Sequence, residues 1–328
     1  MTIHQHIAAG IDLGSNTFRL LVADCSTKTL LALAKKLETV RLGRGLKENG
    51  LLQNEAMQKG FAVLQTFREI LDRYQPHFIR ICGTEALRQA QNNQLFLQKA
   101  EEILQQSIHI LDGEEEACLS LAGALSGKRK LLSTPFLLVD VGGGSTELVF
   151  TEPFTENIRT ISLPLGAVWL TERFFTKPQH NFASLDSLLT ETLNSSLEKL
   201  KLLEKTRQIT IIGCGGTATS LAALQLGLPS YNESLVHGHI LQSTAIEELW
   251  AKLTALPAEK RNELPCLGEG RGEILPAGIR ILQILLKLLH QDRMQISDTG
   301  LLEGILLSSI TCEDCTPNYW AKGPADRL

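Results

Sequence analysis

The sequence predicts an α/β protein of two lobes, and three observations predict it. The chain has 328 residues, of which 43% are apolar, enough to bury a sizeable core, and domains usually hold about 100–200 residues. Segments with strand character are interspersed with segments of helical periodicity. A unit of strand, glycine turn and strand occurs twice, with its turn at 12–17 and again at 140–145.

The first lobe, residues 1–127, is expected to begin with an antiparallel meander. Apolar runs at 7–13, 18–23 and 30–40 are joined by short turns. Apolar residues at helical spacing predict a helix at 54–74, just before Pro76. A strand at 78–82, a helix at 92–106, a strand at 107–111 and a helix from about 113 to 125 complete the expected lobe.

The second lobe, residues 128–328, is expected to repeat this plan beyond the polar, basic stretch 126–133. Its predicted strands are 136–141, 146–150, 158–163, 209–212 and 294–297. Its predicted helices are 166–175, 182–203, 214–226, 242–256, 276–289 and 299–309. Whether the final helix, at about 299–310, packs back on the first lobe stays open.

Charge and hydropathy exclude some classes of function. A net charge of −4 and a pI near 6.1 argue against broad nucleic-acid binding. The start of the chain lacks the features of a signal peptide. The apolar run 279–289 is broken by Arg280 and Lys287 and is shorter than the ~20 residues of a membrane span. Seven scattered cysteines fit reduced thiols, so a cytoplasmic protein is expected.

The repeated turns are candidate phosphate loops, because glycine lets backbone N–H groups approach an anion closely. Asp12 and Asp140 end the preceding strands and are expected to hold a divalent cation, Mg²⁺, through water. The alternative is a pair of hairpin turns in which each aspartate bonds its own turn, but the repetition favours the phosphate loops. The candidate phosphate-binding residues are Gly14, Ser15, Asn16, Thr17, Gly142, Gly143, Gly144, Ser145 and Thr146.

Three successive glutamates open the helix expected from 113. Asp112 and Glu115 have the spacing of a capping box, and acidic residues at a helix start are ordinary dipole stabilisation. Glu116 lies one position further, where a carboxylate could accept a proton from an attacking water. Its stripe carries the small residues Ser120, Gly123 and Gly127, which are expected to line a cleft.

A third glycine turn leads from a strand into the helix at 214–226. It suits a second phosphate or the sugar of a nucleotide, and close helix packing explains it equally well. Its candidate residues are Gly213, Gly215, Gly216 and Thr217. Arginines make bidentate phosphate contacts, although a solvated surface charge is the commoner fate. The candidates are Arg19, Arg88, which follows Thr84 in GTEALRQAQN, and Arg271.

Two further pairs are weaker candidates for metal sites. Cys312 and Cys315 have the spacing of half a zinc site, but no second pair accompanies them. His237 and His239 form an isolated pair, which is expected to contact ligand or backbone rather than metal.

Seven segments together resemble the Ppx/GppA phosphatases, that is, the exopolyphosphatases and guanosine pentaphosphate phosphohydrolases. They occur in family order from residue 9 to about 309. The segments are GIDLGSNTFRLLVAD, GTEALRQAQN, LDGEEEACLSLAGAL, LLVDVGGGSTELVF, LPLGAVWLTERF, IIGCGGTATSLAAL and ISDTGLLEGIL.

The resemblance implies two ribonuclease-H-like lobes of the actin, sugar-kinase and chaperone-ATPase superfamily, with the active site in the interlobe cleft. It implies that Glu116 is the catalytic residue that activates water. Asp140 and Glu147 match acidic positions associated with metal and water, and Gly142 to Ser145 match a phosphate loop. Arg19, Arg88 and Arg271 match arginines that contact phosphate.

The implied activity is Mg²⁺-assisted hydrolysis of terminal phosphoanhydride bonds in polyphosphate, guanosine pentaphosphate or both. Trp169 and Leu302 stand where the family usually has arginine, so weaker binding of long anionic chains is expected. The chain resembles short forms without a C-terminal helical domain. An actin-like kinase or ATPase, and a non-catalytic guanosine tetraphosphate sensor, stay open as alternatives, as does a homodimer.

Overall fold

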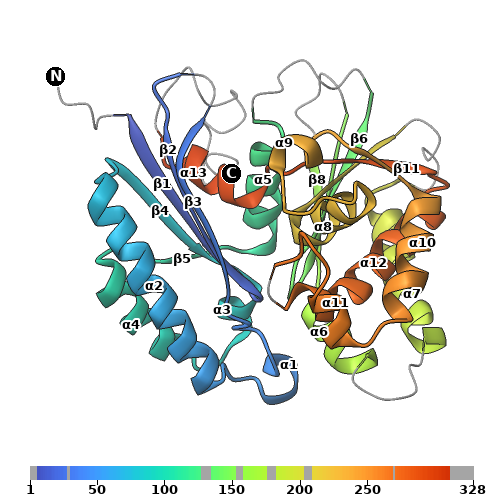
Figure 1. Cartoon of the computed structure of the whole chain (residues 1–328), viewed down its shortest axis with the longest axis horizontal. Coiled ribbons are helices and arrows are strands. Elements are labelled where there is room, and N and C mark those ends of the chain that lie inside the picture. Colours follow the sequence, from blue (N-terminus) through green and yellow to red (C-terminus); the bar gives the residue numbers. More distant parts are fainter. Residues whose placement is uncertain are drawn as a thin grey trace. The chain divides into compact units, whose positions relative to one another are not determined.

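The computed structural model describes residues 6–27, 30–126, 134–152, 158–175, 182–202, 209–268 and 270–310. Contacts divide the chain into two units, one of Met1–Lys130 with Gly300–Leu328 and one of Leu131–Thr299. Figure 1 shows a sheet with helices in each unit, as an α/β protein of two lobes requires. The second unit ends at Thr299, and the final helix belongs to the first unit.

The sheet of the first unit begins with the predicted meander. Strands β1 (Ile7–Leu13), β2 (Thr17–Asp24) and β3 (Leu31–Thr39) pair antiparallel in sequence order. On the other side of β1, β4 (Phe78–Gly83) and the short β5 (His109–Ile110) are added in parallel, which gives the order β3-β2-β1-β4-β5. Every residue of β1 is buried, as expected for a central strand covered on both faces.

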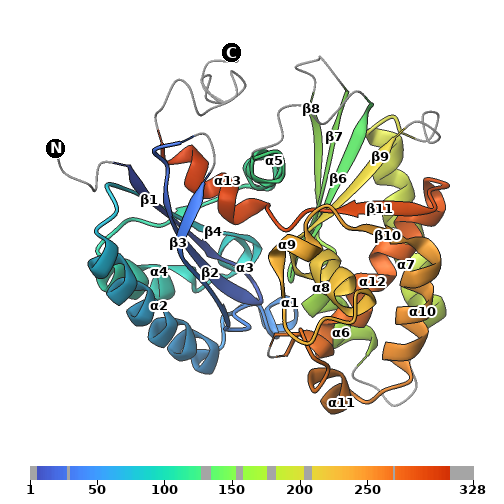
Figure 2. The ribbon, with the colours of Figure 1, turned by 45° about the horizontal axis from the view of Figure 1, so that its top comes forward.

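Two pairs of helices cover this sheet. Helices α2 (Asn54–Tyr74) and α4 (Asn93–Leu104) lie on one face, and α5 (Gly113–Ala124) and α13 (Leu301–Ser308) lie on the other (Figure 2). The buried residues of α2 recur at helical spacing, which explains why periodicity predicted its bounds. Helices α1 (Leu46–Asn49) and α3 (Glu85–Gln89) were not predicted, because each is too short to show a period.

The contact between α5 and α13 corrects one expectation. A Cβ on Gly123 would lie 1.7 Å from the carbonyl oxygen of Gly300, and one on Gly304 would lie 1.9 Å from that of Leu119. The two helix backbones therefore touch, and Ser120 on the same stripe is fully buried. These small residues were expected to line a cleft, but Ser120 and Gly123 instead allow close helix packing; Gly127 lies outside the described residues.

The second unit repeats the strand order of the first. Strands β6 (Phe136–Val141), β7 (Thr146–Thr151) and β8 (Ile158–Leu163) form a second antiparallel meander. Beyond β6, β9 (Thr210–Cys214) and β11 (Arg293–Ile296) are added in parallel, and β10 (Ile240–Gln242) is an antiparallel edge. The duplicated ribonuclease-H-like plan is therefore present in both units.

Helix α12 (Arg271–Leu288) is packed among the other helices of this unit. Those helices are α6 (Ala167–Phe174), α7 (Phe182–Lys199), α8 (Gly215–Gln225), α10 (Ser243–Thr254) and α11 (Ala258–Asn262), while the short α9 (Glu233–Val236) contacts α8. The expected start of α12 at Pro276 was wrong: the helix begins at Arg271, and the buried residues around Pro276 hold it helical despite the lost N–H. No helix in the described parts of the chain is long and apolar enough to cross a membrane.

Candidate functional site

The first candidate phosphate loop connects β1 to β2. The N–H of Gly14 donates to the carbonyl of Thr17 at 3.1 Å and closes the turn. Two carbonyls of the turn are occupied: Ser15 O accepts from Gly43 N at 2.8 Å, and Asn16 O accepts from Val40 N at 2.9 Å and from the amide of Arg41 at 2.8 Å. Hydrogen bonds to these two carbonyls thus fix the orientation of the peptide groups of the turn.

The second candidate loop, between β6 and β7, has the same geometry. The N–H of Gly142 donates to Ser145 O at 2.9 Å. The carbonyls of Gly142 and Gly143 each accept, at 2.9 Å, an N–H from the first turn of α6. No described residue accepts a hydrogen bond from the amides of Gly143, Gly144 or Ser145.

In each loop, two carbonyls are therefore engaged within the protein while backbone amides of the turn have no backbone acceptor among the described residues. Carbonyls engaged by the protein and amides left over make a concave group of N–H dipoles, which is a binding site for an anion. In the first loop the buried side-chain nitrogen of Asn16, Nδ2, has no acceptor among the described residues. A buried donor without an acceptor is costly, so its presence favours an anionic ligand at this loop.

Asp12 and Arg19 form an ion pair beside the first loop. They are directly opposed across β1 and β2, and Oδ2 of Asp12 accepts from Nε of Arg19 at 2.7 Å and from Nη2 at 2.6 Å. The adjacent guanidinium opposes a second cation at this carboxylate. Arg19 thus engages only Oδ2 of Asp12, while its buried Oδ1 has no hydrogen-bond partner among the described residues, and the role of Asp12 as a metal ligand stays a prediction.

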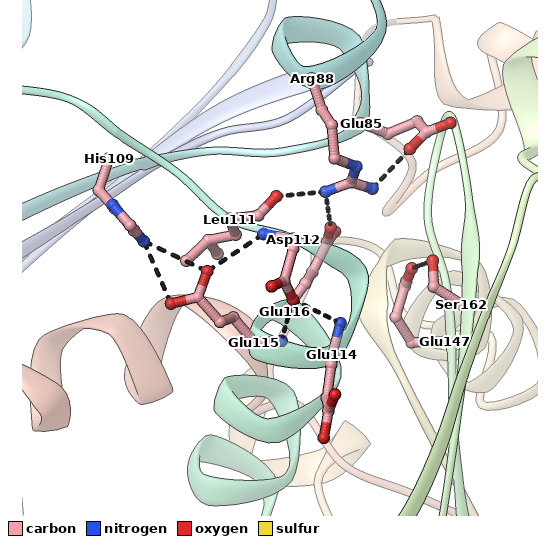
Figure 3. A network of polar contacts seen from close by, with 10 residues as sticks. All are labelled: Glu85, Arg88, His109, Leu111, Asp112, Glu114, Glu115, Glu116, Glu147 and Ser162. Carbon is pink, nitrogen blue, oxygen red and sulfur yellow. Dashed lines mark hydrogen bonds and ion pairs between the residues drawn. The ribbon is translucent and has the colours of Figure 1, made fainter. Parts of the chain in front are cut away.

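Asp140 and Glu147 fit a metal better. They are directly opposed across β6 and β7, and Glu147 is opposed in turn by Ser162 on β8, whose hydroxyl donates to Oε1 at 2.8 Å (Figure 3). Directly opposed residues on one face of a sheet have Cβ atoms about 4.5–5.5 Å apart, and like charges there are destabilising. Both carboxylates are nevertheless buried. A bound cation would relieve this repulsion.

Two glycines at the start of α8, Gly215 and Gly216, are in close contact with side chains of other candidate residues. A Cβ on Gly215 would lie 2.1 Å from Oδ1 of Asp140, so the carboxylate rests on the backbone of this residue, whose φ is +75°. A Cβ on Gly216 would lie 2.2 Å from Nη2 of Arg271. The third turn thus lies against Asp140 on one side and the Arg271 guanidinium on the other, and the structure brings these predicted residues together.

Three predicted phosphate ligands have structural contacts instead. The hydroxyl of Thr146 is fully buried and donates to Leu165 O at 2.6 Å, so it is not free to bind phosphate. Thr217 is buried and its hydroxyl donates to Val141 O at 3.4 Å. Gly213 admits the side chain of Met294, whose Cε would lie 2.1 Å from an added Cβ. These contacts depend on the direction of each side chain and on residues from other elements. A turn motif in the sequence shows neither.

Glu116 is buried in the first turn of α5. The predicted capping box is confirmed: Asp112 accepts from the amides of Glu114 and Glu115, and Glu115 accepts from the amide of Asp112 (Figure 3). These contacts hold the helix start, and only 8% of the Glu116 side chain is exposed. A carboxylate so restrained is oriented by its neighbours rather than by solvent.

The main neighbour is Arg88 on α3. Its Nη1 donates to Oε2 of Glu116 at 3.2 Å and to Leu111 O, and its Nη2 donates to Oε2 of Glu85 at 2.5 Å. Burial alone would lower the pKa of Arg88, but Glu116 and Glu85 together raise it above its ordinary value. Arg88 was predicted to contact phosphate; here it bridges two glutamates. Thr84, which precedes α3, is buried at the end of β4.

Glu85 is the residue that motif reasoning missed. It is buried and opens α3 directly after β4. The available signal was its spacing: residues three apart on a helix are neighbours, so Glu85 and Arg88 form a pair in GTEALR.

The remaining candidates lie apart from this chemistry. Leu302 is buried in a core cluster with Ala8 and Leu21, so this position does not present its side chain to solvent. The ring of Trp169 lies 5.4 Å from the Arg173 guanidinium carbon. His237 Nδ1 accepts from the Asp298 amide at 3.2 Å, a backbone contact as expected. Cys312 and Cys315 lie outside the described residues. Among those that are described, no three His, Cys, Asp or Glu residues cluster as a metal site.

Comparisons with known proteins show which family the chain resembles over most of its length. The model of the Ppx/GppA phosphatase family matches residues 21–313. A guanosine-5'-triphosphate,3'-diphosphate pyrophosphatase of Vibrio vulnificus is 35% identical over 305 residues, which cover 90% of this chain and 58% of the relative. Exopolyphosphatase 2 of Mycobacterium tuberculosis is 29% identical over 316 residues, covering 92% of this chain and 97% of the relative.

A solved structure of a member of the same family is also similar to this chain. The crystal structure of the Aquifex aeolicus member of the Ppx/GppA family superposes with a TM-score of 0.73 at 31% identity, covering 92% of this chain and 96% of that one. The chain spans about three fifths of the length of the Vibrio relatives it matches.

Proposed function

Because the chain belongs to the Ppx/GppA phosphatase family, we propose that it hydrolyses the terminal phosphoanhydride bond of inorganic polyphosphate or guanosine pentaphosphate and releases orthophosphate. Relatives named for each of these two activities match most of the chain. The proposal therefore concerns which substrate is used and which residues carry the reaction.

The observation that carries the proposal is the donor surface of the two loops. In each, two turn carbonyls accept hydrogen bonds within the protein, those of Ser15 and Asn16 in the first loop and of Gly142 and Gly143 in the second, while the turn amides that follow Gly14 and Gly142 have no backbone acceptor among the described residues. Preorganised N–H dipoles of this kind stabilise the charge that develops on phosphoryl oxygens without reorganising during the reaction. We assign phosphate binding to Gly14–Asn16 in one unit and to Gly143–Ser145 in the other.

Glu116 is proposed to act on water. Its carboxylate accepts a proton as the water oxygen bonds to the terminal phosphorus, and the bridging P–O bond breaks. The electron pair of that bond stays on the oxygen of the shortened substrate, and the new P–O bond yields orthophosphate. Proton transfer to a positioned carboxylate contributes about 10²–10⁴-fold to rate. Arg88 orients this carboxylate through Oε2.

Asp140 and Glu147 are the proposed holders of Mg²⁺. The ion is bound in phosphoryl-transfer sites by one or two carboxylates, water and substrate oxygens, and these buried, opposed carboxylates supply that donor set. When bound, Mg²⁺ would neutralise charge on the substrate phosphates. Arg271, resting against Gly216, supplies a fixed positive charge in the same unit.

The test is phosphate release by the intact protein from tripolyphosphate, long-chain polyphosphate and guanosine pentaphosphate, each at equal concentration of terminal phosphate and with Mg²⁺ present. We expect release from at least one of the three, and the ratio of kcat/KM values identifies the preferred substrate. Binding of guanosine tetraphosphate without release from any of them would overturn hydrolysis in favour of a sensor.

A further inference from the structure

Three directly opposed residues form a row across β6, β7 and β8. Asp140 on β6 faces Glu147 on β7, and Glu147 faces Ser162 on β8, the edge strand of the sheet. Directly opposed residues lie on the same face of a sheet, so the three side chains are neighbours. The hydroxyl of Ser162 donates to Oε1 of Glu147 at 2.8 Å (Figure 3). One carboxylate of the row is therefore held from the edge strand.

The first unit has an equivalent row with different chemistry. There Asp12 on β1 faces Arg19 on β2, and Arg19 faces Leu37 on β3. The Arg19 guanidinium contacts Asp12 at 2.6 Å, whereas the Leu37 side chain has no polar atom. In the second unit a glutamate takes the place of the arginine, and a serine takes the place of the leucine. The outer strand thus supplies a hydroxyl in the unit whose row carries two carboxylates.

A hydroxyl and a guanidinium affect a neighbouring carboxylate differently. An adjacent guanidinium cancels the negative charge, whereas a neutral hydroxyl donates a hydrogen bond and leaves the charge for a cation. Only 2% of Glu147 is exposed, so protein groups rather than bulk water orient its carboxylate. A long side chain held by a hydrogen bond also loses rotamer freedom before any ion arrives. This arrangement suits a carboxylate that receives a cation at a fixed place.

We propose that Ser162 is a positioning residue of the metal site, whose hydroxyl fixes the Glu147 carboxylate so that it binds Mg²⁺ together with Asp140. Because it takes these two carboxylates as the holders of the ion, this role rests on the proposed function. Ser162 acts through Glu147 and is assigned no contact with metal or substrate. Groups that orient a ligating carboxylate in this way typically contribute about 10–100-fold to metal affinity or activity.

The experiment measures Mg²⁺ binding to the intact protein by isothermal titration calorimetry, with the metal alone and no substrate. Ser162→Ala removes the hydroxyl and keeps the Cβ, and its dissociation constant for Mg²⁺ should rise about 10–100-fold. Ser162→Thr keeps a hydroxyl and suits a strand, so its dissociation constant should stay within about threefold of the wild type. If Ser162→Ala does not fold, Ser162→Cys replaces it, because a thiol has a similar shape and is a weak donor.

Thr160→Val is the matched control. Thr160 lies two residues before Ser162 on the same face of β8, is likewise partly buried and faces the apolar Val149. Its replacement removes a hydroxyl from β8 outside the row, so Mg²⁺ binding should stay within about threefold of the wild type. In EDTA, Thr160→Val and Ser162→Ala should have similar melting temperatures. The Mg²⁺ concentration that raises the melting temperature should be about 10–100-fold higher for Ser162→Ala alone.

The outcomes distinguish this role from the proposed function. Wild-type affinity for Mg²⁺ in Ser162→Ala would overturn the role of Ser162, and so would an equal loss of affinity in Thr160→Val or in Ser162→Thr. Absence of Mg²⁺ binding by the wild-type protein would also overturn it. Absence of phosphate release from every substrate would instead refute the proposed function, and the titration without substrate would still decide whether Ser162 supports the metal site.

Discussion

Replacing Gly215 by alanine should separate catalysis from folding in the second unit. Gly215 has a φ of +75°, and an added Cβ would lie 2.1 Å from Oδ1 of Asp140. A left-handed conformation costs a non-glycine residue about 1–2 kcal/mol. In addition, the carboxylate of Asp140 must retreat by about 1 Å to reach an ordinary contact distance, and a displacement of about 1 Å at a reacting centre can cost about 100-fold in rate.

A matched control is available just past the other end of α8. Gly227, just beyond the end of α8, has a φ of +61°, and no described atom lies within 4 Å of the Cβ that alanine would add. Gly227→Ala therefore carries the backbone strain without the displacement of Asp140. Gly227→Ala should lose about 1–2 kcal/mol of unfolding free energy, measured in urea, and Gly215→Ala at least as much, because it also displaces the buried Asp140 carboxylate.

Only Gly215→Ala should lose activity. We expect its kcat to fall about 100-fold and its half-saturating Mg²⁺ concentration to rise, while Gly227→Ala keeps both near the wild-type values. Equal kcat and equal Mg²⁺ dependence in the two variants would refute the placement of Asp140 at the reaction.

Two further predictions concern the first unit. Gly123→Ala should lower the melting temperature of the intact protein, because the new Cβ would lie 1.7 Å from Gly300 O and would force α13 away from α5. The expected cost is about 1–3 kcal/mol of unfolding free energy. An unchanged melting temperature, measured by circular dichroism, would contradict this helix contact. Cys82 should resist iodoacetamide at pH 8, since burial raises its pKa to about 12 and leaves a thiolate fraction of about 10⁻⁴. Alkylation of Cys82 as fast as that of a free peptide thiol, followed by mass spectrometry, would disprove its burial.

Much of the fold could be predicted because strong local patterns coincide with buried faces. The bounds of β1, α2, β6 and β8 agree with those expected from apolar periodicity and turn residues. The two meanders follow from short turns, since only antiparallel neighbours can be joined so closely.

Tertiary packing was less predictable. The association of α13 with α5 depends on Gly123 and Gly304, whose contact partners are far away in sequence. A stripe of small residues looks the same whether it lines a cleft or admits another helix. Likewise, Pro276 resembled a helix start, and only the burial around it explains why α12 continues through it.

The candidate site was predictable as a set of motifs but not as a network. The duplicated glycine turns indicated anion binding, and the structure adds the direction of their peptide groups. The sequence could not reveal that Arg88 faces Glu85 and Glu116, or that the Thr146 hydroxyl bonds Leu165 O. Such contacts depend on rotamers and on partners from other elements.

The most direct test of the account is the rate of phosphate release by Glu116→Gln. Glutamine keeps the size of the side chain and an acceptor for Arg88, but it cannot take a proton from water. If Glu116 activates the water, kcat should fall about 10²–10⁴-fold, with tripolyphosphate binding at equilibrium within a few-fold of the wild type. A kcat within about twofold of the wild type would show that another group activates the water.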